Sequence, residues 1–232
     1  MIVLNQQLLI ANIAHPIVEK RIQGTTKRMQ HYQHKPSFIT KEESDWLYAK
    51  LLKDVPWRQV KYYKPERGLV VTPRLTWCCG FHQDEYYDIR LPQLVSPQEI
   101  PRWLQPLKSL VESELSTSFN FILFSYYRDG QDSIAFHSDD ERFLGEEPTI
   151  ASITVGAPRP FILKEKATKV SQTFSLDHGD LFVMQRNCQS DYLHSVPKMT
   201  KALPRISLTF RKALSEAGSK NYYKYNYLDK PI

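Results

Sequence analysis

The pattern of apolar and polar residues predicts short β-strands over most of the second half of the chain. Six segments alternate or form short apolar runs, and glycine, proline or charged residues separate them: 119–127, 149–155, 159–165, 172–176, 180–185 and 205–212. Segments of this length and punctuation are typical of an antiparallel sandwich or barrel. Residues 57–90 are rich in Tyr, Thr and Val, and they predict further strands and hairpins.

Helical spacing occurs in two stretches ahead of these strands. In residues 35–55 the apolar residues form one helical face, Thr40 and Glu43 resemble a capping box, and Pro56 ends the helix. Residues 96–115 predict a second helix on the same spacing. The predicted fold class is therefore mainly β, or α+β, with helices flanking the sheets toward the N-terminus.

The two ends of the chain lack such patterns. Residues 1–36 are basic and polar without a clear period, and we expect an N-terminal arm there. Residues 214–232 are rich in Tyr and predict a C-terminal tail. Residues 37–213 then form one domain of ordinary size.

The composition indicates the size of the core and the cellular environment of the protein. With 232 residues, 41% of them hydrophobic, the chain can bury a large core. Three cysteines, two of them adjacent, do not make a disulfide framework and indicate a reducing, intracellular setting. No secretory signal is visible, and no run approaches the ~20 apolar residues of a membrane span. We expect an intracellular protein of the nucleus or cytoplasm with no membrane attachment.

The charge favours one class of partner. The formal net charge is +6 at pH 7, which suits a polyanion such as nucleic acid. Many basic proteins bind no nucleic acid, so charge alone leaves the partner open.

A charged patch, "AFHSDDER" at residues 135–142, lies between two apolar runs and predicts a metal half-site. In a strand, His137 and Asp139 project to the same face. Among the other histidines we choose His194 as the third ligand, because it lies beside a strand-like stretch just before the last long strand. Two His and one carboxylate form the open site of non-haem Fe(II) oxygenases, whereas structural zinc prefers four ligands. The alternative is that His137 and Asp139 only form hydrogen bonds at a strand end.

The last long strand carries two arginines on one face. Arg205, Ser207, Thr209 and Arg211 alternate with the apolar Ile206, Leu208 and Phe210. Buried guanidiniums need anions, and two of them can grip a short dicarboxylate such as 2-oxoglutarate. The alternative is a solvent-exposed face with two surface arginines.

These residues together resemble the AlkB family of Fe(II)/2-oxoglutarate dioxygenases over roughly residues 55–213, in the animal branch that prefers single-stranded DNA and RNA. The pieces that carry the resemblance are "PWRQ", "PRLTWCCG", "RDGQDSIAFHSDDE", "PTIASITVGAPRPFIL", "LDHGDLFVM", "DYLHSVPK" and "PRISLTFRK".

The resemblance implies a double-stranded β-helix (jelly-roll) core, with a substrate lid at about residues 57–90. It implies Fe(II), 2-oxoglutarate and O₂ as cofactor and co-substrates. The residues that it assigns are His137, Asp139 and His194 as iron ligands, and Arg205, Arg211 and Tyr127 as co-substrate ligands.

The chain departs from the family at the floor of the co-substrate site and in the lid. Ser125 and Ser207 stand where the family usually has Asn, so we expect weaker 2-oxoglutarate binding without loss of activity. Cys79 replaces the family's aromatic residue before the lid glycine.

The resemblance also implies a reaction, the oxidative removal of N-methyl groups from nucleic-acid bases as formaldehyde. Asp140 and Glu141 are the expected catalytic and substrate-binding carboxylates, because N1-methyladenine and N3-methylcytosine are cationic. Tyr86 and Tyr87 are candidates for stacking on the base, and core tyrosines are the alternative. Arg74 is a candidate for contacting the base or a phosphate.

The stretch "KYYKPERG" lacks the apolar wedge by which relatives open duplex DNA, so we expect a preference for single strands. We expect a monomer. The alternatives are a related oxygenase acting on a protein or small molecule, and a non-catalytic nucleic-acid binder.

Overall fold

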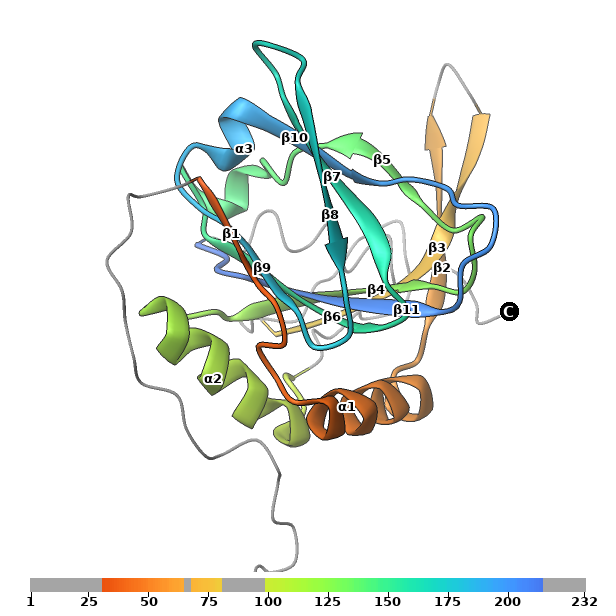
Figure 1. Ribbon diagram of the computed structural model, residues 1–232, viewed down its shortest axis with the longest axis vertical. Coiled ribbons are helices and arrows are strands. Elements are labelled where there is room, and N and C mark those ends of the chain that lie inside the picture. The colour runs from red at the N-terminus through yellow and green to blue at the C-terminus, as the bar shows by residue number, and fades with distance from the viewer. Residues whose placement is uncertain (1–30, 65–67, 81–98, 215–232) are drawn as a thin grey trace, which may run out of the picture.

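Two packed β-sheets dominate the computed structural model, which describes residues 31–64, 68–80 and 99–214 (Figure 1). Every strand pairing within the two sheets is antiparallel. The larger sheet contains, in spatial order, β1 (Tyr32–Lys35), β9 (Leu181–Met184), β6 (Ile150–Gly156), β11 (Arg205–Arg211), β4 (Phe121–Tyr127), β3 (Gly68–Gly80) and β2 (Arg58–Lys64). The smaller sheet contains β5 (Ile134–His137), β10 (Tyr192–Val196), β7 (Arg159–Glu165) and β8 (Ser171–Leu176).

Helices α1 (Lys41–Asp54) and α2 (Gln105–Leu115) lie along the outer face of the larger sheet (Figure 1). The predicted capping box of α1 is confirmed. The Thr40 hydroxyl accepts from the Glu43 amide at 3.2 Å, and the Glu43 carboxylate accepts from the Thr40 amide at 2.7 Å. The helix ends at Asp54, ahead of Pro56, whose ring cannot continue it.

The second helix begins later than its apolar spacing predicts. A short 3₁₀ helix (η1, Arg102–Leu104) precedes α2, and a second one (η2, Arg142–Leu144) follows β5. Pro106 is tolerated in the first turn of α2 because that turn needs no amide donor there. Ser116 ends α2 in the left-handed conformation, with φ 49°. A one-turn helix, α3 (Cys188–Asp191), leads into β10.

Two hydrophobic clusters hold the layers together. The first joins the helices to the larger sheet, and it includes Leu47, Leu51, Leu107, Val111, Phe124, Ile153 and Leu208. The second fills the space between the sheets, and it includes Phe121, Leu123, Phe161, Leu163, Phe182 and Met184. The three cysteines are free and buried in these clusters.

Strand β11 shows why this sequence forms a sandwich. Its apolar residues Ile206, Leu208 and Phe210 belong to the helix-side cluster. Its polar residues therefore face the space between the sheets, where Arg205 and Arg211 are 2% and 3% exposed. The alternative of a solvent-exposed arginine face is wrong.

The segment predicted as an N-terminal arm contributes one strand. Tyr32–Lys35 pairs with Leu181–Met184 at the edge of the larger sheet, and His34 Nε2 lies 2.8 Å from the Asp180 carboxylate. Its side chains are polar or half-buried, so the segment carries no apolar alternation in the sequence. Residues 1–30 and 215–232, which hold most of the predicted arm and tail, lie outside the described residues. Within the described part of the chain, no helix is long and apolar enough to cross a membrane.

Candidate metal centre and anion pocket

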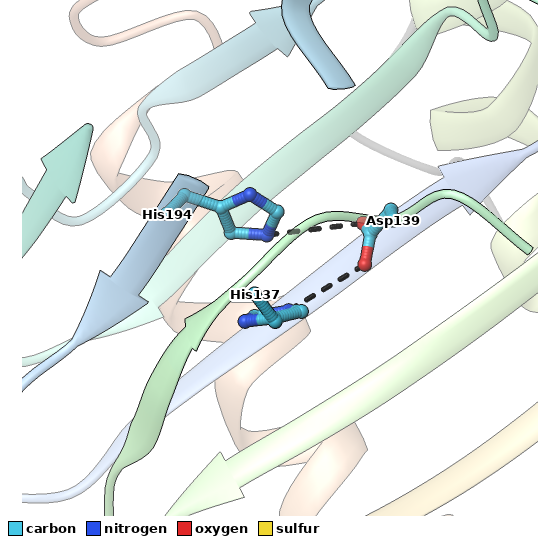
Figure 2. Close-up of side chains that lie close together, drawn as sticks. All are labelled: His137, Asp139 and His194. Atoms are coloured by element: carbon cyan, nitrogen blue, oxygen red, sulfur yellow. Dashed lines mark ion pairs between the residues drawn. The ribbon is translucent and has the colours of Figure 1, made fainter. Parts of the chain in front are cut away.

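Two side chains that are close in the sequence, His137 and Asp139, meet a distant third, His194 (Figure 2). His137 ends β5, and β10 places His194 directly opposite it, so the two rings lie 4.2 Å apart between centroids. Asp139 Oδ1 lies 3.5 Å from His137 Nε2, and Asp139 Oδ2 lies 4.0 Å from His194 Nε2. One ligand atom from each residue falls within 4.8 Å of the other two.

The backbone after β5 positions Asp139. The strand ends at His137, so the alternation that predicted a shared face does not extend to Asp139, and that premise is wrong. Instead, the Asp139 amide donates to Gln189 Oε1 at 2.8 Å, which fixes the loop. Arg211 Nη2 then donates to Asp139 Oδ2 at 2.9 Å and orients the carboxylate.

The pKa shifts of Asp139 and His194 favour the protonation states that bind a cation. Burial acts to raise the pKa of Asp139, but Arg211 and the two histidines outweigh it and hold the pKa well below its usual range. Burial lowers the pKa of His194 to about 3. An ionised carboxylate and a neutral imidazole are the forms that coordinate metals. The His137 Nδ1 atom lies 2.9 Å from the Ala135 carbonyl, which leaves Nε2 directed toward Asp139.

The donor set fits Fe(II). Two imidazoles and one carboxylate suit this metal and leave positions open for other ligands. Among the described residues, no other group of three or more His, Cys, Asp or Glu side chains lies close enough to share an ion. A closed structural zinc site, with four ligands, is not what this geometry offers.

A cavity of about 130 Å³ extends from the three side chains between the sheets. Strand β11 contributes all four residues of its polar face to the cavity wall. Its two neighbours in the same sheet, β4 and β6, contribute cavity-lining residues on either side of it. The residues that line it are Arg74, Leu123, Ser125, Tyr127, Ile134, His137, Asp139, Glu141, Ser152, Phe161, Leu176, Met184, His194, Val196, Arg205, Ser207, Thr209 and Arg211.

Arg205 gives the cavity an unbalanced positive charge. Its Nη2 donates to Thr154 Oγ1 at 2.9 Å, and its guanidinium carbon lies 5.2 Å from the centre of the Tyr127 ring. Its Nε and Nη1 are buried and have no hydrogen-bond partner among the residues that the structure describes. Burial and the nearby Arg159 guanidinium lower the pKa of Arg205, which means that the site disfavours the charge it holds. A carboxylate at this position relieves both penalties, so the residues fit a 2-oxo dicarboxylate.

The buried Arg159 side chain holds together the backbone segments next to the two histidine-bearing strands, β5 and β10. It is 1% exposed, and its guanidinium donates to the carbonyls of Asp129, Asp132 and Pro197 at 2.7–3.0 Å. These carbonyls belong to the loop that enters β5 and the segment that leaves β10, so one side chain fixes both strands that carry the histidines. Sequence spacing gave no signal for this role.

A row of small hydroxyl residues runs across the larger sheet, and its two middle members, Ser125 and Ser207, line the cavity. Register pairs Thr76 with Ser125, Ser125 with Ser207, and Ser207 with Thr154, on four neighbouring strands. Arg74 Nε donates to Ser125 Oγ at 3.4 Å. The two serines that depart from the AlkB pattern are therefore adjacent, and both line the cavity.

The predicted substrate residues are distributed unevenly. Glu141 lines the cavity, and its carboxylate lies 3.6 Å from Arg211 Nη1. Burial raises the pKa of Glu141, and Asp139 adds to the effect while Arg211 opposes it. Asp140, in contrast, is exposed and does not line the cavity. Tyr86 and Tyr87 lie outside the described residues.

Sequence reasoning missed three residues of the site: Thr154, Gln189 and Met184. Thr154 accepts from Arg205, and the buried Gln189 side chain lies between the Asp139 amide and Met184 Sδ, 3.4 Å from the sulfur. The contacts with Arg205 and Asp139 join segments that are far apart in the chain, and no local pattern in the sequence indicates them.

The chain matches a known family over most of its length. The family described as "2OG-Fe(II) oxygenase superfamily" matches residues 31–211. The chain is 39% identical over 186 residues to "Alpha-ketoglutarate-dependent dioxygenase alkB homolog 3" of Mus musculus, which covers 76% of this chain and 64% of that protein. It is 35% identical over 137 residues to "DNA oxidative demethylase ALKBH2" of Arabidopsis thaliana, which covers 47% of this chain and 44% of that protein.

The chain thus spans less than two thirds of the length of the curated relatives it matches. A solved structure of OsALKBH1 superposes with a TM-score of 0.57 at 13% identity, covering 81% of this chain and all of that one. This likeness concerns the fold alone, and with the family match it confirms the predicted jelly-roll core.

Proposed function

The chain belongs to the 2OG-Fe(II) oxygenase superfamily, with AlkB homologues as relatives, and on this premise we propose that it demethylates alkylated nucleic-acid bases by oxidation. One atom of O₂ enters the succinate formed from 2-oxoglutarate, with release of CO₂. The other atom leaves with the methyl carbon as formaldehyde, and the unmethylated base is restored. The expected lesions are of the N1-methyladenine and N3-methylcytosine type, so the reaction is a direct reversal of alkylation damage.

The observation that carries this proposal is the convergence of two sites in one cavity. His137, Asp139 and His194 would hold Fe(II), and the buried, partly unpaired Arg205 would bind the far carboxylate of 2-oxoglutarate. When bound, Fe(II) and 2-oxoglutarate would activate O₂, which is the oxidant, and the protein orients the partners.

The remaining residues of the site have positioning roles. Tyr127 packs against the Arg205 guanidinium and holds it over the cavity. Ser125 and Ser207 offer hydroxyl groups at the floor, and Arg211 orients Asp139 from the same strand as Arg205. The sandwich surrounds the cavity and limits the access of bulk water to the reacting groups.

The substrate assignment rests on charge. N1-methyladenine and N3-methylcytosine carry a positive charge, and the Glu141 carboxylate lines the cavity that would receive them. Arg74, on β3, lines the same cavity and can contact the base or its phosphate. Asp140 would act at the entrance, where it is exposed, and Tyr86 and Tyr87 would stack on the base.

We further propose a single-stranded substrate, a monomeric protein and an intracellular location in the nucleus or cytoplasm. Support for the first comes from the sequence "KYYKPERG" at residues 61–68, which lacks the apolar wedge by which relatives open a duplex. A base must leave its stack to reach a cavity between two sheets, and this costs less in a single strand.

The test is incubation of a single-stranded oligonucleotide containing N3-methylcytosine with the protein, Fe(II) and 2-oxoglutarate, followed by mass spectrometry. We expect loss of the methyl group with release of succinate, faster than on the same sequence in a duplex, and no product with Asp139→Ala. Succinate release without demethylation would favour an oxygenase of proteins or small molecules. If the protein binds nucleic acid but not Fe(II), the result would favour the alternative of a non-catalytic nucleic-acid-binding protein.

A further inference from the structure

An aromatic side chain stands exposed beside the metal centre. Phe136 is the residue before His137 on β5, and its ring lies beside the Lys164 side chain of β7. It is 43% exposed and does not line the cavity, whereas its neighbour His137 does. The ring contributes nothing to either hydrophobic cluster, so packing of the core does not account for it.

A cation accompanies this ring. Lys164, on β7, places its Nζ 5.4 Å from the centre of the Phe136 ring. We refer to Phe136 and Lys164 together as the rim patch.

The rim patch lies on the border of the cavity. In the described part of the chain β5 pairs only with β10, so it is an edge strand, and its Ile134 and His137 line the cavity. Phe136 is therefore next to a predicted metal ligand, on an edge strand at the border of the cavity. A polynucleotide with one base in the cavity would pass its neighbouring nucleotide over this edge.

We propose that the rim patch binds the nucleotide next to the target base, with that neighbour's base stacked on Phe136 and its phosphate paired with Lys164. Stacking on an aromatic ring accepts any base, because every base has a π-face, and the lysine supplies the complementary charge. The patch is one ring with one cation rather than a broad apolar surface, which is the chemistry of a nucleotide rather than of a protein partner.

This inference rests on the proposed function and adds a source of strand preference to it. In a duplex the neighbouring base is stacked and paired, and it cannot turn onto Phe136 without breaking those contacts. In a single strand it is free to do so. The rim patch would thus favour single strands even where no wedge residue opens a duplex.

The experiment compares a methylated single-stranded pentanucleotide with the corresponding methylated mononucleotide, which has no neighbour. We expect the ratio of their kcat/KM values to fall about tenfold in Phe136→Ala, the order expected for one lost stacking contact. Phe136→Leu keeps an apolar side chain without a ring, and it should lower this ratio as much as Phe136→Ala does. Phe136→Trp keeps an aromatic ring and should leave the ratio unchanged. Val170→Ala, at another exposed apolar residue between β7 and β8, should change neither rate.

Lys164→Gln tests the phosphate contact. The slope of log binding constant against log salt for an unmodified single-stranded oligonucleotide should become shallower by about one counterion. An unchanged pentanucleotide to mononucleotide ratio in both Phe136→Ala and Phe136→Leu would overturn the proposal.

If the wild-type protein demethylates neither substrate, the proposed function is wrong. Nucleotide binding by the rim patch is then tested by fluorescence anisotropy with the unmodified oligonucleotide. The proposal is supported if Phe136→Ala raises the Kd about tenfold while Phe136→Trp keeps the wild-type Kd. It is excluded if the Phe136→Ala variant and the wild type have the same Kd.

Discussion

Arg211 Nη2 donates to Asp139 Oδ2 at 2.9 Å, and both side chains are buried. The predicted iron carboxylate and the last strand of the sandwich are therefore joined directly. Because neither charge has much access to water, each depends on the other for its stability in the folded protein. The metal centre cannot be altered at Asp139 without consequences for the fold.

Asp139→Ala should lower the free energy of unfolding of the metal-free protein by about 3 kcal/mol, because it leaves the Arg211 charge buried without its main partner. His137→Ala should cost much less, since His137 is half-buried and, within the described part of the chain, its ring lies against the Ala135 carbonyl and its fellow ligands. Both variants should lose Fe(II) binding. Denaturant unfolding and metal titration measure the two effects, and equal losses of stability would contradict the ion-pair argument.

Arg205→Met should remove 2-oxoglutarate binding while changing the stability of the ligand-free protein by no more than about 1 kcal/mol. The variant loses the Thr154 hydrogen bond but also removes a buried charge that Arg159 repels. Thermal unfolding with and without 2-oxoglutarate gives the measurement, since a bound ligand raises the Tm of the wild type. A strongly destabilised variant would show that Arg205 is paired within the protein itself.

Replacing Ser125 and Ser207 together with Asn should tighten 2-oxoglutarate binding, by about 1 kcal/mol for each amide that reaches the ligand. The two residues are cross-strand partners on the cavity floor, so their side chains act on the same ligand. Calorimetric titration of the single and double variants tests this. Unchanged affinity in the double variant would mean that the hydroxyls already satisfy the co-substrate.

Glu141→Gln should reduce kcat/KM for a cationic methylated base about tenfold or more, and Asp140→Asn should reduce it less. Glu141 lines the cavity, whereas Asp140 is exposed at its entrance, where solvent weakens its attraction for the base. Steady-state kinetics on the N3-methylcytosine oligonucleotide distinguish them. The reverse ranking would place the target base near the entrance.

The thiols of Cys78, Cys79 and Cys188 should not react with alkylating reagents at neutral pH in the folded protein. Burial raises the pKa of Cys188 to about 12 and raises those of the adjacent pair as well. A raised pKa keeps the thiol protonated, and the thiolate is the reactive form. Mass spectrometry after labelling should find three modified cysteines in denatured protein and none in the native state.

The sequence predicted the elements whose signals are local. The alternation of Arg205–Arg211 fixes which side of β11 faces the helices, and Thr40 with Glu43 marks the start of α1. The AlkB resemblance added the jelly-roll core. Strand β1 was not predicted, because its polar side chains carry no apolar period.

Contacts between segments that are far apart in the chain could not be predicted from the sequence. Asp139 reaches its position through Gln189 and Arg211 rather than through strand alternation, and neither partner is near it in the chain. Arg159 looked like an ordinary residue at the start of a strand, yet it fixes the segments that hold both histidines. Tyr86 and Tyr87, in the predicted lid, lie outside the described residues and stay predictions.

The central place of β11 in the larger sheet has a consequence for synthesis on the ribosome. This strand is the last in the described chain, yet it inserts between β6 and β4, which are translated long before it. Until it emerges, those two strands lack their shared neighbour, and the nascent polypeptide has neither Arg205 nor Arg211. The proposed co-substrate site is therefore incomplete until this last strand has been synthesised and inserted between its neighbours.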